Sequence, residues 1–132
     1  MFKSNMDVET NIVIDLENGI YCLGGYSATG KTRLAKVLRT IQKKTRDVIS
    51  FSYDDLLVGS SLEQMLKLSD GVPKVVMLDR FDLYKDLYTD ILNDLGSKSI
   101  VLIDCKTETP VDLQDDQFAL LLMKQNKIEV KL

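Results

Sequence analysis

The 132-residue sequence contains no histidine, no tryptophan, two cysteines and two prolines. Because histidine is missing and Cys22 and Cys105 stand far apart, we expect no structural zinc site. Each cysteine lies in an apolar run typical of a β-strand, where a thiol behaves as a small hydrophobic group, although a disulfide between the two stays open. No apolar run approaches the roughly 18 residues of a membrane-spanning helix, and the N-terminal residues do not resemble a signal peptide. We therefore expect a cytoplasmic protein without a membrane partner.

What the chain does contain is enough for one domain, which we assign to residues 1–132. Hydrophobic residues make up 45% of the sequence, and this length is usual for a single domain. The net charge is −3, so the chain as a whole does not indicate a nucleic-acid partner. Basic residues are concentrated between Lys31 and Arg46, and we interpret them as the solvated face of a helix.

Apolar periodicity and turn residues predict alternating strands and helices. Asn18-Gly19 between the apolar runs 12–16 and 20–23 predicts an opening β-hairpin, because both central residues of such a turn accept positive φ. The later signals predict a helix through about Lys44, strands at 47–52, 75–79 and 100–103, and a closing hairpin of 118–123 and 128–132. A second helix is predicted from the capping-box pair Ser60 and Glu63. A third helix is predicted with Asp82 as its cap and Gly96 as its end, and its apolar stripe is Leu83, Leu87, Ile91 and Leu95. Strands that alternate with helices indicate an α/β fold with a parallel sheet.

A phosphate-binding pattern lies between the second strand and the first helix. Residues 25–32 fit Gly-x-x-x-x-Gly-Lys-Thr in full. In such a loop the backbone N–H groups converge on phosphate oxygens, the lysine approaches the β- and γ-phosphates, the threonine hydroxyl binds Mg²⁺, and the following helix adds its N-terminal dipole. The candidate nucleotide-binding residues are Gly25, Tyr26, Ser27, Ala28, Thr29, Gly30, Lys31, Thr32 and Arg33.

This loop, with a strand before it and an amphipathic helix after it, resembles the P-loop (Walker-motif) NTPase superfamily. Val75–Asp79 resembles the Walker B strand, so the resemblance implies a metal site of Thr32 and Asp79. The chain is similar to a minimal ABC/AAA-like ATPase core, in a compact format that suggests a bacterial or phage mobile element. The resemblance implies a three-layer α/β fold with a mainly parallel sheet of core order 5-1-4-3-2, formed by 118–123, 20–24, 100–104, 75–79 and 48–52, with N- and C-terminal β-hairpins.

The resemblance implies ATP and Mg²⁺ as ligands, but it is incomplete for hydrolysis. ABC- and AAA-type proteins carry a glutamate at or near the position after the Walker B aspartate, and here Arg80, Phe81 and Asp82 follow instead. Asp82 and Asp104 are the candidates to orient water, and Arg80 is a candidate to pair with Asp79 or a phosphate. We therefore expect an ATP-binding accessory or regulatory factor with slow or partner-dependent hydrolysis, acting with a protein partner or by self-association.

Two alternatives stay open. The segment Tyr53-Asp54-Asp55-Leu56 resembles that of small P-loop kinases, with Asp54 or Asp55 as the base that accepts the proton of an acceptor hydroxyl. The other alternative is an interaction protein without enzymatic activity, with Phe81, Tyr84 and Tyr88 as its contact face.

Overall fold

The computed structural model describes residues 1–5, 11–24, 28–69, 71–104 and 117–132, and all its strands join one sheet of order β1-β2-β8-β7-β3-β6-β5-β4. Two neighbouring pairs, β1–β2 and β7–β8, are antiparallel, and the other five pairs are parallel. The strands are β1 (Phe2–Asn5), β2 (Asn11–Asp15), β3 (Gly19–Gly24), β4 (Val48–Phe51), β5 (Val75–Leu78), β6 (Ile100–Ile103), β7 (Phe118–Lys124) and β8 (Lys127–Lys131).

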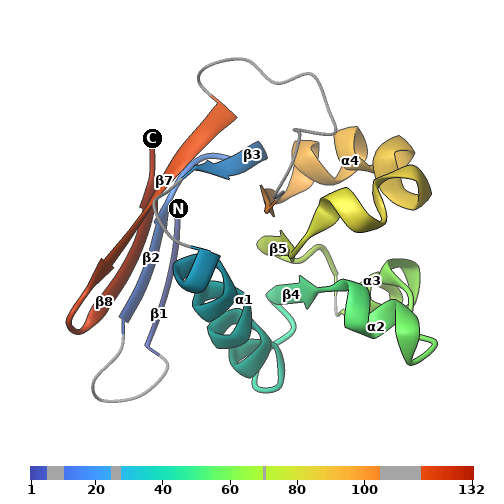
Figure 1. Cartoon of the computed structure of the whole chain (residues 1–132), viewed down its shortest axis with the longest axis horizontal. Coiled ribbons are helices and arrows are strands. Elements are labelled where there is room, and N and C mark those ends of the chain that lie inside the picture. Colours follow the sequence, from blue (N-terminus) through green and yellow to red (C-terminus); the bar gives the residue numbers. More distant parts are fainter. Residues whose placement is uncertain (6–10, 25–27, 70, 105–116) are drawn as a thin grey trace.

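The helices pack on both faces of this sheet. They are α1 (Ala28–Gln42), α2 (Tyr53–Leu57), α3 (Leu62–Leu68), the 3₁₀ turn η1 (Phe81–Leu83) and α4 (Lys85–Lys98). The sheet curls, so that β1, β2, β8 and β7 stand at a steep angle to β5 and β4, and α1 lies on the concave side (Figure 1). One hydrophobic core joins α1 to the concave face, and a second core joins α3 and α4 to the opposite face of the central strands.

The central strands follow from their composition. Every residue of β4, β5 and β6 is buried, as expected for parallel strands that are covered on both faces. In β2 and β8 buried residues alternate with more exposed ones, because only the concave face of these strands is covered by α1. Among the described residues no helix is both long and apolar enough to span a membrane.

The predicted fold class is wrong. A mainly parallel, layered sheet of five core strands was expected, whereas the structure has an eight-stranded mixed sheet that curls toward a half-barrel (Figure 1). The sheet does contain β7, β3, β6, β5 and β4 as consecutive parallel neighbours. However, β8, β2 and β1 extend it beyond β7, so the terminal strands are part of the sheet and not separate hairpins.

The opening hairpin was predicted between the wrong strands. The alternation in β2 shows that one face is buried, but it does not specify the partner strand. In the structure β2 pairs with β1 and β8, while Gly19 begins β3 and its N–H donates to the carbonyl of Ser99. β8 and β7 therefore separate the two strands that Asn18-Gly19 was expected to join, whereas the closing hairpin is present as β7–β8.

The predicted face of the fourth helix is correct only in its second half. Leu95 is buried and Ile91 packs against the core, but Leu83 and Leu87 are 48% and 62% exposed, and Tyr88 and Leu92 are buried instead. Gly96 does not end the helix, since α4 continues to Lys98. A Cβ on Gly96 would lie 2.7 Å from Cγ1 of Ile20, so this glycine allows α4 to pack closely on β3.

Capping differed from the sequence pattern by small shifts in register. The capping box of α3 is Ser61 with Gln64, one residue later than the expected Ser60 and Glu63. Asp82 lies inside η1 and does not cap α4, whose N-cap position is Tyr84.

Candidate functional site

Two aspartates end neighbouring parallel strands and are held there by backbone hydrogen bonds. The N–H of Asp79 donates to the carbonyl of Phe51 at 2.9 Å, and the N–H of Asp104 donates to Leu78 at 3.0 Å. The Tyr84 hydroxyl donates to the carbonyl of Asp79 at 2.7 Å. These bonds fix both carboxyl groups at the carboxyl edge of the sheet, which is where ligands bind in open α/β sheets.

The first helix brings a lysine to this edge. Lys31 lies in the first turns of α1, and its Nζ is 3.4 Å from Oδ1 of Asp104. The Lys31 side chain is 16% exposed and that of Asp104 is 8% exposed. Because both groups are largely removed from water, their attraction is stronger than that of a surface ion pair.

The carboxyl group of Asp104 is close enough to that of Asp79 to influence its ionisation. Burial is the main reason that the pKa of Asp79 rises to about 6, and the neighbouring carboxyl group of Asp104 raises it further. The positive charge of Arg80 lowers this pKa, and the negative charge of Asp54 raises it by a smaller amount. Carboxyl groups this close cannot both carry full charge at low cost, so the pair attracts a proton or a cation.

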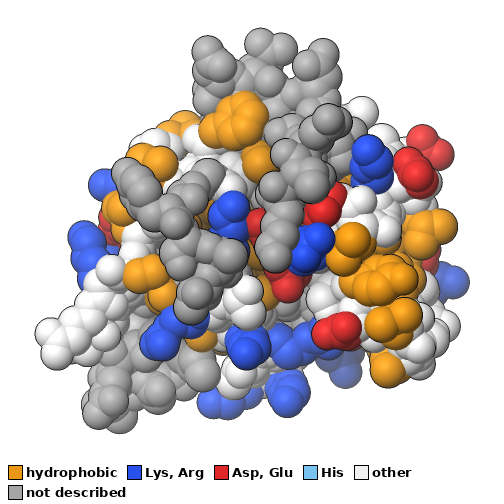
Figure 2. Space-filling model, viewed as in Figure 1, with side chains coloured by type: hydrophobic (Ala, Val, Ile, Leu, Met, Phe, Trp, Pro, Cys, Tyr) orange, Lys and Arg blue, Asp and Glu red, His pale blue; other side chains and the backbone are white. Residues whose placement is uncertain are grey.

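A polar cavity of about 390 Å³ adjoins this cluster between α1 and the end of β4. Its lining combines two acids, two cations and four hydroxyl groups, and Ala35 is its one apolar residue. This composition suits a charged, hydrophilic ligand and not an apolar one. The lining residues are Thr32, Ala35, Lys36, Arg39, Thr40, Ser50, Ser52, Asp54 and Asp79. Acidic and basic side chains lie beside one another in the middle of the face that Figure 2 shows.

The predicted nucleotide-binding residues are described only in part. Gly25, Tyr26 and Ser27 lie outside the described residues, and for Ala28 and Thr29 only the backbone, at the start of α1, is described. Gly30 is buried in the helix, where a Cβ would meet Leu121 and Met123 at ordinary contact distances. The helix itself therefore does not require glycine at position 30. Arg33 is exposed on α1, and Thr32 is exposed at the rim of the cavity.

Arg80 and Asp82 are bound to each other. Nε and Nη2 of Arg80 each donate to the Asp82 carboxylate at 3.2 Å. Arg80 has a left-handed backbone with φ of 51°, which is uncommon for a residue other than glycine and marks a tight turn after β5. The expected pairing of Arg80 with Asp79 is thus replaced by a pairing with Asp82, although Arg80 is close enough to influence the pKa of Asp79.

The structure distinguishes the two aspartates proposed as a kinase base. Asp55 is buried; its Oδ2 forms an ion pair with Arg39 and accepts the N–H of Ser52 at 2.8 Å. Asp55 therefore supports α2. Asp54 is exposed and lines the cavity beside Asp79.

The aromatic residues proposed as a contact face are inside the protein. Phe81, Tyr84 and Tyr88 are 0%, 3% and 3% exposed. Together with Phe51 they form edge-to-face pairs with centroid separations of 5.4 to 6.1 Å. They are core residues, so this alternative loses the surface on which it depended.

The sequence did not reveal the contact between Lys31 and Asp104 or the cavity residues Lys36, Arg39 and Ser52. A signal for the Asp79–Asp104 pair did exist. The expected strand order placed the runs ending at these two aspartates side by side, and parallel neighbours end at the same edge. The cavity had no such signal, because it depends on how α1 lies against β4.

No known protein-family model, curated protein or solved structure matches the chain. Within the described part of the chain, no group of three or more aspartate, glutamate, cysteine or histidine side chains is placed to hold a metal ion by itself.

Proposed function

We propose that this protein binds a nucleoside triphosphate as its Mg²⁺ complex, with ATP favoured. The observation that carries the proposal is that Lys31, the lysine of a complete phosphate-loop sequence, lies beside Asp104, which in turn is close to Asp79. A lysine among helix N–H groups suits the phosphates, and the carboxyl pair suits the cation. The resemblance to Walker-motif proteins supports the roles proposed for these residues, but it does not extend to the fold.

The residues present fit Mg²⁺. This ion is usually bound by one or two carboxylates, with waters and substrate phosphates completing its shell, and it needs no all-protein cage. The Thr32 hydroxyl and the Asp79 carboxylate line the same cavity and would hold it. Bound Mg²⁺ would neutralise negative charge on the phosphates, while Lys31 and the N–H groups of α1 orient them.

Slow or partner-dependent hydrolysis is part of the proposal. Asp82 forms an ion pair with Arg80, and Asp104 forms one with Lys31. Because each carboxylate already binds a cation, neither is available to act only as the group that orients an attacking water. A partner, or a second copy of the chain, would have to supply a water-orienting group or a cation. The proposal keeps the cytoplasmic location expected from the sequence.

Calorimetric titration with ATP and Mg²⁺ tests the proposal. The wild-type chain should bind, and Lys31→Ala should weaken binding at least tenfold, which corresponds to about 1.4 kcal/mol. Lys43→Ala removes an exposed lysine near the opposite end of the same helix region and should leave the affinity unchanged. Because Lys31→Ala also leaves Asp104 without its cation, Lys31→Ala/Asp104→Asn serves as a second variant. Absence of wild-type binding, or equal affinities of all variants, rejects the proposal.

The cavity favours phosphoryl transfer as a second candidate function. Asp54 lies on its wall with Thr32 and Asp79, where an acceptor hydroxyl beside the γ-phosphate would be within reach of a base. In such a transfer the acceptor oxygen bonds to the γ-phosphorus, its proton passes to Asp54, and the bond to the β-phosphate oxygen breaks to leave ADP. Asp54→Asn should then abolish acceptor-dependent ADP formation without changing ATP affinity. ADP formation that is independent of any acceptor and unaffected by Asp54→Asn supports hydrolysis instead.

A further inference from the structure

Positive charge is strongly segregated in this chain. Residues 31–46 contain seven lysines and arginines and no acid, whereas the rest of the chain contains ten basic and twenty acidic residues. The net charge of −3 therefore conceals a local positive region on an acidic protein. Figure 2 shows Lys and Arg side chains gathered over α1 and the turn that follows it.

Five of these seven side chains are exposed and form no ion pair with the described acidic residues. Lys31 and Arg39 are engaged by Asp104 and Asp55. The remaining five take no part in the ion pairs found in the described chain, and each is exposed. These five, Arg33, Lys36, Lys43, Lys44 and Arg46, define the α1 basic face.

The α1 basic face follows one side of the helix. Arg33, Lys36 and Thr40 are spaced by three and four residues, which places them in one row along α1, and Lys43, Lys44 and Arg46 come soon after the helix ends at Gln42. The apolar side chains of α1 that the structure describes are buried; they are Leu34, Ala35, Val37, Leu38 and Ile41. Among the described side chains, the face therefore carries cations and a hydroxyl group and no exposed apolar side chain from α1.

This composition discriminates among classes of partner. A membrane-surface helix needs an exposed apolar side that enters the lipid, and α1 uses its apolar side for the core. A tight protein interface needs buried aromatic or aliphatic anchors, which the row lacks. Binding to a phosphate backbone needs only regularly placed cations and polar groups.

We propose that the α1 basic face binds the phosphate backbone of nucleic acid without base preference. At a rise of about 1.5 Å per residue, Arg33 to the end of α1 at Gln42 span about 14 Å, and Lys43, Lys44 and Arg46 lie in the segment that follows the helix. One strand of duplex DNA carries a phosphate every 3.4 Å along the axis, so about four phosphates lie along the helix alone. The five cations thus face a comparable number of phosphate charges. Lys36 lines the cavity and Arg33 belongs to the candidate nucleotide-binding residues, so the test below uses Lys43, Lys44 and Arg46, which belong to neither set.

Fluorescence anisotropy with a short labelled DNA duplex, and with one of its single strands, tests this inference. If all five cations contact phosphates, the logarithm of the association constant should fall with the logarithm of salt concentration with a slope of about −4 to −5 on the duplex. Two duplexes of different sequence should bind equally. Lys43→Ala/Lys44→Ala/Arg46→Ala should reduce the slope to about −2 and weaken binding at least tenfold at about 50 mM salt. These three positions are distant from the carboxyl pair, so nucleotide affinity should be unchanged.

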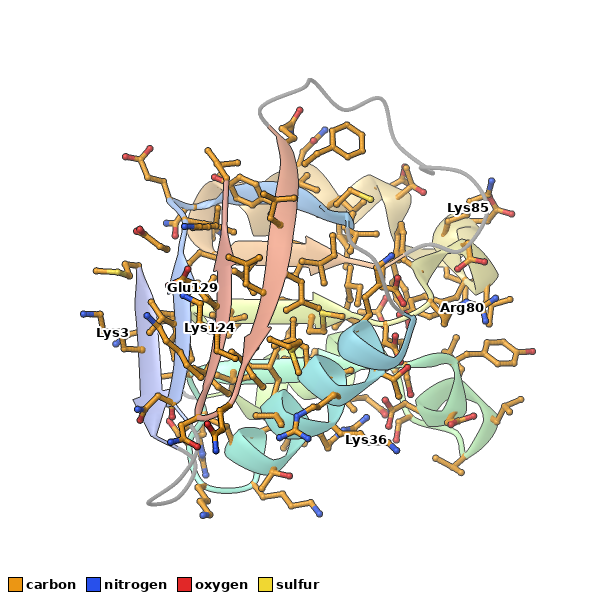
Figure 3. All side chains as sticks on the ribbon, turned by 60° about the vertical axis from the view of Figure 1, so that its left-hand side comes forward. Lys3, Lys36, Arg80, Lys85, Lys124 and Glu129 are labelled. Carbon is orange, nitrogen blue, oxygen red and sulfur yellow. The ribbon has the colours of Figure 1, made fainter. Side chains whose placement is uncertain are left out.

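The control removes three other exposed lysines, Lys3, Lys124 and Lys131, which lie on β1, β7 and β8; of these, Lys131 is paired with Glu129. Figure 3 shows Lys3 and Lys124 on the strands remote from Lys36. Lys3→Ala/Lys124→Ala/Lys131→Ala changes the net charge equally but should retain at least half of the wild-type affinity. Equal losses in both triple variants would mean that net charge and not the α1 basic face binds DNA, and this outcome overturns the inference. Absence of wild-type binding at low salt, or binding only to phosphatidylserine vesicles, also overturns it.

Discussion

Nζ of Lys31 lies 3.4 Å from Oδ1 of Asp104, and Asp104 in turn raises the pKa of the neighbouring Asp79. The lysine that we assign to the nucleotide phosphates is therefore already held by a carboxylate. A phosphate anion arriving alone has to displace Asp104 and then lies beside two carboxyl groups, which is unfavourable in a partly buried site. A phosphate that arrives with a divalent cation exchanges this repulsion for attraction.

Asp104 should therefore make nucleotide binding depend on metal. In the wild-type chain the affinity for ATP should be at least tenfold higher with Mg²⁺ than with EDTA. Asp104→Asn removes the competing charge but keeps the side chain's size, so it should strengthen metal-free ATP binding about tenfold. The difference between the ATP affinities with Mg²⁺ and with EDTA should therefore become smaller. Calorimetry in both buffers measures this. Weaker metal-free binding by a folded Asp104→Asn variant would mean that Asp104 supports the phosphate site directly.

The raised pKa of Asp79 makes stability depend on pH in a defined direction. In the folded chain this pKa is about 6, above its ordinary value of 3.8, so folding favours the protonated form. Below about pH 3 the group is protonated in both states and costs nothing; as the pH rises from about 4 through 6 the folded state loses stability. Asp79→Asn should therefore raise the free energy of unfolding by about 1–3 kcal/mol at pH 8 and leave it nearly unchanged at pH 4.

Urea denaturation at the two pH values checks this prediction. Asp94→Asn, at an exposed residue of α4, is the control and should show no such difference. A loss of stability in Asp79→Asn at pH 8 would contradict the carboxyl-pair description.

Asp55 and its neighbour Asp54 should respond oppositely to substitution. Asp55→Ala leaves the Arg39 guanidinium and the N–H of Ser52 without their carboxylate, and should destabilise the fold by about 2–3 kcal/mol. Asp54→Ala changes an exposed side chain and should stay within about 0.5 kcal/mol. Thermal and urea unfolding measure both. Similar destabilisation by the two substitutions would be inconsistent with the structural role assigned to Asp55.

Gly96 is a packing residue, so Gly96→Ala should destabilise despite the higher helix propensity of alanine. The new Cβ would lie 2.7 Å from Cγ1 of Ile20, which forces α4 away from β3. We expect a loss of about 1–3 kcal/mol, typical of an overpacked core. Ser97→Ala, at the next and exposed position, is the control. If Gly96→Ala is stabilising, the glycine acts as a weak helix residue and not as a close contact.

The sequence predicted the local elements better than the way they join. Val75–Leu78 and Ile100–Ile103 are continuous apolar runs, so their burial as central strands followed from composition. The pairing of β2 with β8 links positions more than a hundred residues apart, and nothing local encodes it. Asn18-Gly19 supplied a local turn signal that the long-range pairing overrode.

The same distinction holds at the site. The sequence predicts Asp79 and Asp104 as acids at the ends of strands. The ion pair between Asp104 and Lys31 could not be predicted, because it depends on where α1 meets the sheet. The α4 stripe was wrong at Leu83 and Leu87 because leucine spacing was preferred over Tyr84 and Tyr88, which the core buries instead. Aromatic residues with a polar end can be buried when their hydroxyl finds a partner, and the Tyr84 hydroxyl donates to the carbonyls of Phe51 and Asp79.

The most direct measurement of the central claim is a crystal structure of the chain with Mg²⁺ and a non-hydrolysable ATP analogue. The account predicts that Lys31 leaves Asp104 for the β- and γ-phosphates, and that the Thr32 hydroxyl and Asp79 face the metal, directly or through water. A structure in which the analogue binds elsewhere, with Lys31 still paired to Asp104, would contradict it.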